Sequence, residues 1–137
     1  MSEKNVYQLL KKHVIRHPDR IDRIENLTVV GMPDVNLCIE GRESWIEIKA
    51  PREPKRETTP LFGSNHKVSL EQTNWMKRQT DAGGRCFFFI GTNMRFLLLS
   101  GAIGAIINTM SVEELRKVAL WEGMRRKADW KELRETL

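Results

Sequence analysis

The stretch that decides the expected fold is MPDVNLCIEGRESWIEIK, residues 32–49. It contains two apolar runs with alternating polar residues, at 35–39 and 44–49. A short polar connection separates the runs, and its glycine, Gly41, supplies the positive φ that a two-residue hairpin turn needs. This pattern predicts a β-hairpin with one apolar face and one polar face.

The register of the hairpin follows from its turn. With Gly41 and Arg42 as the two turn residues, Asp34 pairs with Lys49 across the hairpin. Side chains alternate along each strand, so directly opposed residues share a face. The polar face then holds Asp34, Asn36, Cys38, Trp45, Glu47 and Lys49. The opposite face holds Val35, Leu37, Ile39, Ile46 and Ile48, which can pack on a core.

The polar face concentrates two carboxylates and an ammonium at one end of the hairpin. Neighbouring carboxylates repel, and a divalent cation relieves that repulsion. A bound cation polarises a phosphoryl oxygen and lowers the pKa of its water, while Lys49 can stabilise transition-state charge. Asp34, Glu47 and Lys49 therefore predict a centre for phosphodiester hydrolysis. On spacing alone, a structural cross-strand Asp–Lys pair worth about 0.2–1 kcal/mol remains an open alternative.

Read whole, Met32-Pro33-Asp34 followed by Glu47-Ile48-Lys49 resembles the signature of the PD-(D/E)XK nucleases. The downstream helix with Ser69 and Gln72, the Gly83-Gly84 pair and the apolar strand after it resemble the virus-type replication-repair nuclease (VRR-NUC) branch. The resemblance spans about residues 2–92. It implies an α/β restriction-endonuclease-like fold, with a mixed β-sheet flanked by helices, and cleavage of DNA that depends on Mg²⁺ or Mn²⁺.

The resemblance also assigns roles to individual residues. The metal ligands it implies are Asp34, Glu47, the backbone carbonyl of Ile48 and, as an extra acidic residue, Glu3. Lys49 matches the catalytic lysine, and Gln72 matches a glutamine that points back at the site. Viral members of this branch form homodimers and cut branched DNA such as four-way junctions. We therefore expect a phage-encoded, homodimeric endonuclease acting in recombination, repair or replication.

Outside the hairpin, the pattern predicts helices and strands within one domain over residues 1–137. Ser2 is the expected N-cap of the first helix, and Ser69 with Gln72 forms a capping box. The expected helices are 3–16, 69–82, 111–121 and 129–136. The expected strands besides the central hairpin are 27–30, 86–90 and 95–99.

Two segments have no clear counterpart in the resembling family. The loop 50–68 contains three prolines, and we expect it to be a substrate clamp, a dimer arm or a disordered insertion. The segment of about 101–137 is expected to be a helical extension that covers the sheet, mediates dimerisation or contacts DNA. The candidate DNA-binding residues are Arg52, Lys55, Arg56, His66, Lys67, Arg125, Arg126 and Lys127. A solvated basic surface is the alternative for the C-terminal cluster.

Composition limits the remaining possibilities. The net charge of +5 favours an anionic partner. No apolar run approaches the roughly 20 residues of a membrane helix, and the N-terminus lacks a secretion signal, so we expect no membrane partner and a location in the host cell cytoplasm. Cys38 and Cys86 have no metal-type spacing and are expected as buried free thiols. The competing hypotheses are a non-catalytic DNA-binding module on the same fold and a structural protein with an accidental motif.

Overall fold

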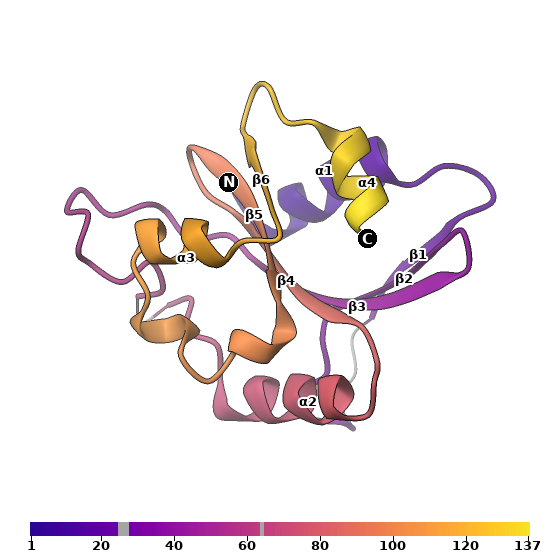
Figure 1. Cartoon of the computed structure of the whole chain (residues 1–137), viewed down its shortest axis with the longest axis horizontal. Coiled ribbons are helices and arrows are strands. Elements are labelled where there is room, and N and C mark those ends of the chain that lie inside the picture. Colours follow the sequence, from indigo (N-terminus) through magenta and orange to yellow (C-terminus); the bar gives the residue numbers. More distant parts are fainter. Residues whose placement is uncertain (25–27, 64) are drawn as a thin grey trace.

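The computed structural model describes residues 1–24, 28–63 and 65–137. In the described residues one six-stranded sheet runs in chain order, and only β3 and β4 are parallel neighbours (Figure 1). The strands are β1 Arg20–Arg23, β2 Val35–Ile39, β3 Arg42–Lys49, β4 Cys86–Gly91, β5 Arg95–Ser100 and β6 Trp121–Met124. The mixed sheet predicted from the sequence is therefore present.

Helices cover both faces of the sheet (Figure 1). One face is covered by α1 Glu3–Val14 and α4 Trp130–Thr136. The other is covered by α2 Leu70–Asp81, α3 Val112–Val118 and the 3₁₀ turns η1 Gly101–Ile103 and η2 Ile107–Thr109. Strand β4 is buried along its whole length because its side chains alternate between the two cores.

The capping predictions are confirmed. The Ser2 side chain accepts the N–H of Asn5 at the start of α1. At α2 the Ser69 side chain accepts the N–H of Gln72, and the Gln72 side chain accepts the N–H of Ser69. These bonds satisfy donors that the first helical turn leaves without partners.

The predicted strand 27–30 is wrong. Leu27 lies outside the described residues, and residues 28–30 form bends and a turn in which Val29 and Val30 are exposed. The first strand is instead β1, which pairs antiparallel with β2. A β-branched pair has high strand propensity, but propensity yields to tertiary context, and β1 offers only Ile21 as an apolar residue.

The predicted hairpin register is also corrected. The turn residues are Glu40 and Gly41, with φ of 49° and 79°, rather than Gly41 and Arg42. A tight turn of this kind requires positive φ at both central residues. Val35 consequently pairs with Ile46, and continuing the ladder places Asp34 opposite Glu47 instead of Lys49. The partner of each residue moves by two positions, so every side chain keeps its predicted face.

The C-terminal segment is only partly the helical extension that we expected: α3 and α4 are present, but a strand lies between them. The helix starting after Ser111 ends at Val118, and Trp121–Met124 forms edge strand β6, paired with β5. Trp121 is 3% exposed and belongs to the core under α4. Burial of this tryptophan explains why an apparently helical sequence continues as a strand.

The loop 50–68 is anchored at several points in its described part, so the disordered alternative is wrong there. Leu61 and Phe62 are buried in the core on the α2 face. The Asn108 side chain accepts the N–H of Val68 and donates to its carbonyl. A one-residue bridge also joins Pro60 to Ser111.

The two cysteines differ in burial. Cys86 is buried and Cys38 only half-buried, and both are free. Within the described residues, no helix combines the length and apolar character needed to cross a bilayer.

Candidate active site

The three residues of the central motif lie together at one end of the internal strands β2 and β3. Asp34 immediately precedes β2, and Glu47 and Lys49 lie in the C-terminal half of β3. All three belong to the face that α2 covers, because Glu47 and Lys49 pair with Phe88 and Ile90 of that core. The sequence prediction that both acids share one face is borne out despite the corrected register.

Glu47 is the most enclosed member of the site, with 2% of its surface exposed. Its Oε1 accepts a hydrogen bond of 2.9 Å from Nε2 of Gln72. The other amide atom of Gln72, Oε1, accepts the N–H of Ser69 at 3.0 Å, so the capping box orients the amide toward Glu47. Gln72 therefore caps α2 and contacts the site at the same time.

The second oxygen of Glu47 is buried without a hydrogen-bond donor among the described residues. Its carboxyl lies within hydrogen-bonding reach of the Asp34 carboxyl, a contact that needs a proton on one of them. Burial, followed by the Asp34 charge, raises the pKa of Glu47 to about 9. Burial also raises the pKa of Asp34, against opposing effects of Glu47 and of the charges on Lys49 and Arg23.

This arrangement fits a divalent cation. The pKa of each acid is raised, so the positive charges of Lys49 and Arg23 do not fully compensate two buried carboxyls. Magnesium is usually bound through one or two protein carboxylates, and water molecules complete its coordination shell. No group of three or more His, Cys, Asp or Glu side chains in the described residues is placed to hold a metal. The protein ligands would therefore be two carboxylates and main-chain oxygen.

Lys49 completes the motif. Its Nζ donates to the carbonyl of Lys67 at 3.4 Å, which ties the lysine to the end of the long loop. Its charge opposes the rise in the pKa of both Asp34 and Glu47, but burial outweighs it. An ammonium beside two acids can hold a phosphate group or stabilise charge that develops on it.

Two further metal ligands were predicted, Glu3 and the carbonyl of Ile48. Glu3, the first residue of α1, is half-exposed, and its charge raises the pKa of Glu47 further. It is near enough to act electrostatically on the site. Ile48 follows Glu47, and its side chain is buried in the opposite core. A ligand role for its carbonyl remains a prediction.

The predicted DNA-binding residues fall into separate groups. The long loop carries four exposed cations and one half-exposed histidine: Arg52, Lys55, Arg56, Lys67 and His66. Arg56 lines a cavity of about 220 Å³ together with Glu53 and Arg95. Arg125, Arg126 and Lys127 are exposed after β6 and line a larger cavity. Only Lys67 contacts the motif, through its main chain.

Sequence reasoning missed two residues that shape the site. Arg23, the last residue of β1, places a positive charge near Asp34. Gly31 has φ of +85°, and a Cβ there would lie 2.3 Å from the carbonyl oxygen of Glu71. The segment leading to Asp34 thus packs against the start of α2. Strand β1, which contains Arg23, has too few apolar residues to be predicted as a strand. A glycine in a loop does not by itself indicate a close backbone contact.

Comparisons with known proteins show which solved structure has a similar fold. No family model and no curated protein sequence matches the chain. Among solved structures, the fold is similar to that of Hjc, a Holliday junction resolvase from the archaeal hyperthermophile Archaeoglobus fulgidus. The TM-score is 0.59 at 10% sequence identity, over 98% of each chain. The restriction-endonuclease-like α/β fold that the sequence resemblance implied is therefore confirmed.

Proposed function

We propose that this chain is a metal-dependent endonuclease that hydrolyses phosphodiester bonds in branched DNA. The observation that carries the proposal is Glu47, buried and held by Gln72, beside Asp34 on the same face as Lys49. The similar fold of a Holliday junction resolvase supports branched DNA as the substrate class.

The side chains have distinct tasks in this proposal. Asp34 and Glu47, with the carbonyl of Ile48, would hold the cation, and Glu3 would add negative charge. Gln72 keeps the Glu47 carboxylate oriented, so that its unpaired oxygen stays available. Lys49 binds the scissile phosphate and stabilises the charge that grows during attack by water. The Mg²⁺ or Mn²⁺, when bound, polarises the phosphoryl oxygen and lowers the pKa of its water.

The finer assignments belong to the same proposal. Membership of the VRR-NUC branch is supported by the capping-box helix that directs Gln72 at Glu47. A homodimer, a phage origin and action in the host cytoplasm during recombination, repair or replication rest on the resemblance of the sequence to that branch. The basic charge of the chain is suited to an anionic substrate.

The proposal is tested with labelled duplex, single-stranded, flap and four-way junction DNA in Mn²⁺, Mg²⁺ and EDTA. We expect metal-dependent nicking of the branched substrates. Lys49→Ala should slow single-turnover cleavage by about 10²–10³-fold, because it removes one transition-state contact, and should leave junction binding in EDTA within a few-fold. Lys77→Ala is the matched control, since Lys77 is an exposed lysine paired with Asp81.

Two results would contradict the proposal. Cleavage that persists in EDTA would exclude metal dependence. Binding of junctions without any cleavage in Mn²⁺ would identify a non-catalytic DNA-binding module on this fold.

A further inference from the structure

A cavity of about 750 Å³ opens where the β4–β5 turn meets the end of β6. Its lining combines three cations with two methionines and one amide. The residues are Asn93, Met94, Met124, Arg125, Arg126 and Lys127. None of them belongs to the Asp34–Glu47 site.

The cavity and the two acids lie at the same end of the strands of the sheet. Lys49 pairs with Ile90 at the ends of β3 and β4, and Met124 pairs with Arg95 where β5 begins and β6 ends. Strands β3 and β6 are three strand spacings apart, which is roughly 14 Å. A DNA chain held at the acids could therefore reach the cavity within a few nucleotides.

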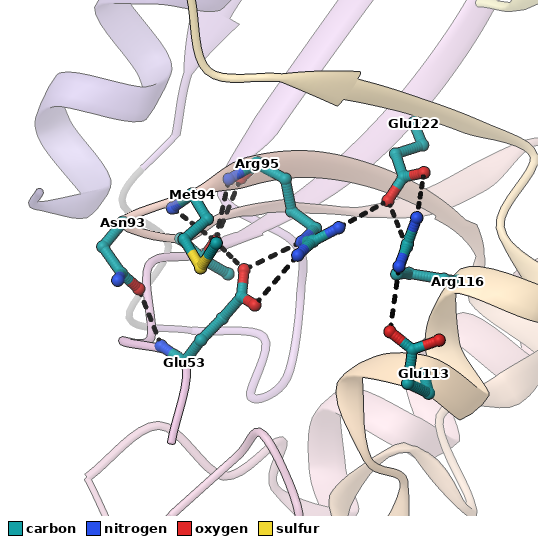
Figure 2. Close-up of polar contacts among 8 residues, drawn as sticks. Glu53, Asn93, Met94, Arg95, Glu113, Arg116 and Glu122 are labelled. Atoms are coloured by element: carbon teal, nitrogen blue, oxygen red, sulfur yellow. Dashed lines mark hydrogen bonds and ion pairs between the residues drawn. The ribbon is translucent and has the colours of Figure 1, made fainter. Parts of the chain in front are cut away.

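The positive charge of the cavity is not neutralised by the protein. The side chains of Arg125, Arg126 and Lys127 are exposed and form no hydrogen bond or ion pair within the described ranges. The acids of the adjoining segments are already paired (Figure 2). Both oxygens of Glu53 accept from Arg95, and Glu122 accepts from Arg95 and Arg116. An anionic ligand would meet three cations without competition from these carboxylates.

Hydrogen bonds of the same segments anchor the wall of the cavity. Glu53 donates its N–H to Oδ1 of Asn93, as Figure 2 shows, and Thr92 Oγ1 accepts the N–H of Met94. The carbonyl of Met94 accepts the N–H of Arg125, which joins the two sides of the cavity. Because Asn93 uses only its oxygen in these bonds, its amide N–H groups remain available to a ligand.

The two methionines give the cavity an apolar surface in addition to its cations. Met94 and Met124 are 47% and 46% exposed, although both are apolar. Thioether side chains are flexible and adapt to flat apolar groups. Cations beside an adaptable apolar surface match a nucleotide, whose phosphate is charged and whose base has an apolar face.

We propose that this cavity is a second nucleotide subsite, in which Arg125, Arg126 and Lys127 hold a phosphodiester and the two methionines receive an unpaired base. The inference rests on the proposed function and deepens it, because it names an unpaired nucleotide near the branch as part of the substrate. A neighbouring cavity of about 350 Å³ shares Arg125 and extends past Asn5 and Lys12 of α1, where the flanking strand can continue.

The test measures binding without cleavage, by fluorescence anisotropy in EDTA over a series of KCl concentrations. The probes are a fully paired four-way junction and the same junction with a single-stranded flap. Arg125→Ala/Arg126→Ala/Lys127→Ala is compared with Arg78→Ala/Lys117→Ala/Lys131→Ala, which removes equal charge from positions outside the cavity. Met94→Ala/Met124→Ala is compared with Val118→Ala/Leu120→Ala, whose residues are similarly exposed.

We expect the cavity charge variant to bind both probes about tenfold or more weakly, with a flatter salt dependence, because each lost phosphate contact lowers the salt slope by about 0.7–0.9. The methionine variant should weaken only the flap junction, by several-fold. The two controls should resemble the wild type.

The outcomes separate the two proposals. If the wild type cuts branched DNA but either cavity variant binds the flap junction as tightly as its control, the subsite is wrong and the proposed function stands. If the wild type neither binds nor cuts these junctions, the proposed function is wrong and the subsite fails with it.

Discussion

Two sets of buried charged residues lie at the same end of the strands. They differ in whether the protein supplies a partner for each charge. In the network of Figure 2, Arg95 and Glu53 have 9% exposed side chains, and their charges are matched by direct bonds. In the Asp34–Glu47 pair, two acids face each other, and one oxygen of Glu47 has no donor among the described residues. The first set is complete in itself, whereas the second needs an added proton or cation.

The pKa values express this difference. Burial acts to raise the pKa of Glu122, but hydrogen bonds from Arg116 and Arg95 outweigh it and the pKa falls below its usual value. Burial and the Asp34 charge together raise the pKa of Glu47 to about 9. Acids that a fold leaves unpaired in this way are typical of functional sites.

The two sets of charge are also held in place by different forces. Opposite charges attract, so the network helps to position its own members. Like charges repel, so the acid pair must be held by the backbone around it. The β3 ladder holds Glu47, the capping box holds Gln72 beside it, and the contact between Gly31 and Glu71 holds the approach to Asp34.

The largest effect on stability is expected from Arg95→Met. It leaves the Glu53 carboxylate buried without its guanidinium and should lower the free energy of unfolding by about 3–5 kcal/mol, as measured by urea denaturation. Arg116→Met removes a more exposed partner of the same network and should lower it by about 1 kcal/mol or less. Equal losses in the two variants would show that burial does not distinguish these arginines.

A smaller effect is expected from Gly31→Ala, which tests whether backbone packing holds the acid pair. The new Cβ would collide with the Glu71 carbonyl and the positive φ would be strained, so we expect a loss of about 1–3 kcal/mol and slower cleavage. Gly41→Ala is the matched control, because Gly41 also has positive φ but a Cβ added to it would meet no other atom within 4 Å. Gly41→Ala should lose stability only through backbone strain and should cleave at the wild-type rate. Similar cleavage rates for the two variants would show that Gly31 does not position Asp34.

The last expected effect is a pH dependence of stability without metal. The Glu47 carboxyl releases its proton near its usual pKa of 4.5 in the unfolded chain and near pH 9 in the folded chain. The folded state therefore binds more protons between these values, and stability should fall as pH rises through that window. Glu47→Gln should flatten the slope between about pH 6 and 8.5 in EDTA. Glu71→Gln, at an exposed position, should keep the wild-type slope; a slope unchanged by Glu47→Gln would show that this carboxyl is not the cause.

Local sequence determined much of the fold. The capping box placed α2 and aimed Gln72, because such caps involve residues only three positions apart. The period-two pattern put Asp34, Glu47 and Lys49 on one face, and this survived a wrong turn assignment because a shift of two positions in the pairing preserves faces. The two-acid motif was therefore available from the sequence alone.

Tertiary structure alone decided the rest. Edge strands β1 and β6 exist because β2 and β5 offer them partners, and β6 also because Trp121 is buried in the core. The contact of Gly31 with α2, the Glu53–Arg95 pair and the cavity at Met94 and Arg125 join segments from about 30 to 40 residues apart. Such contacts depend on how the chain closes its loops and fills its core, and no local pattern of residues encodes them.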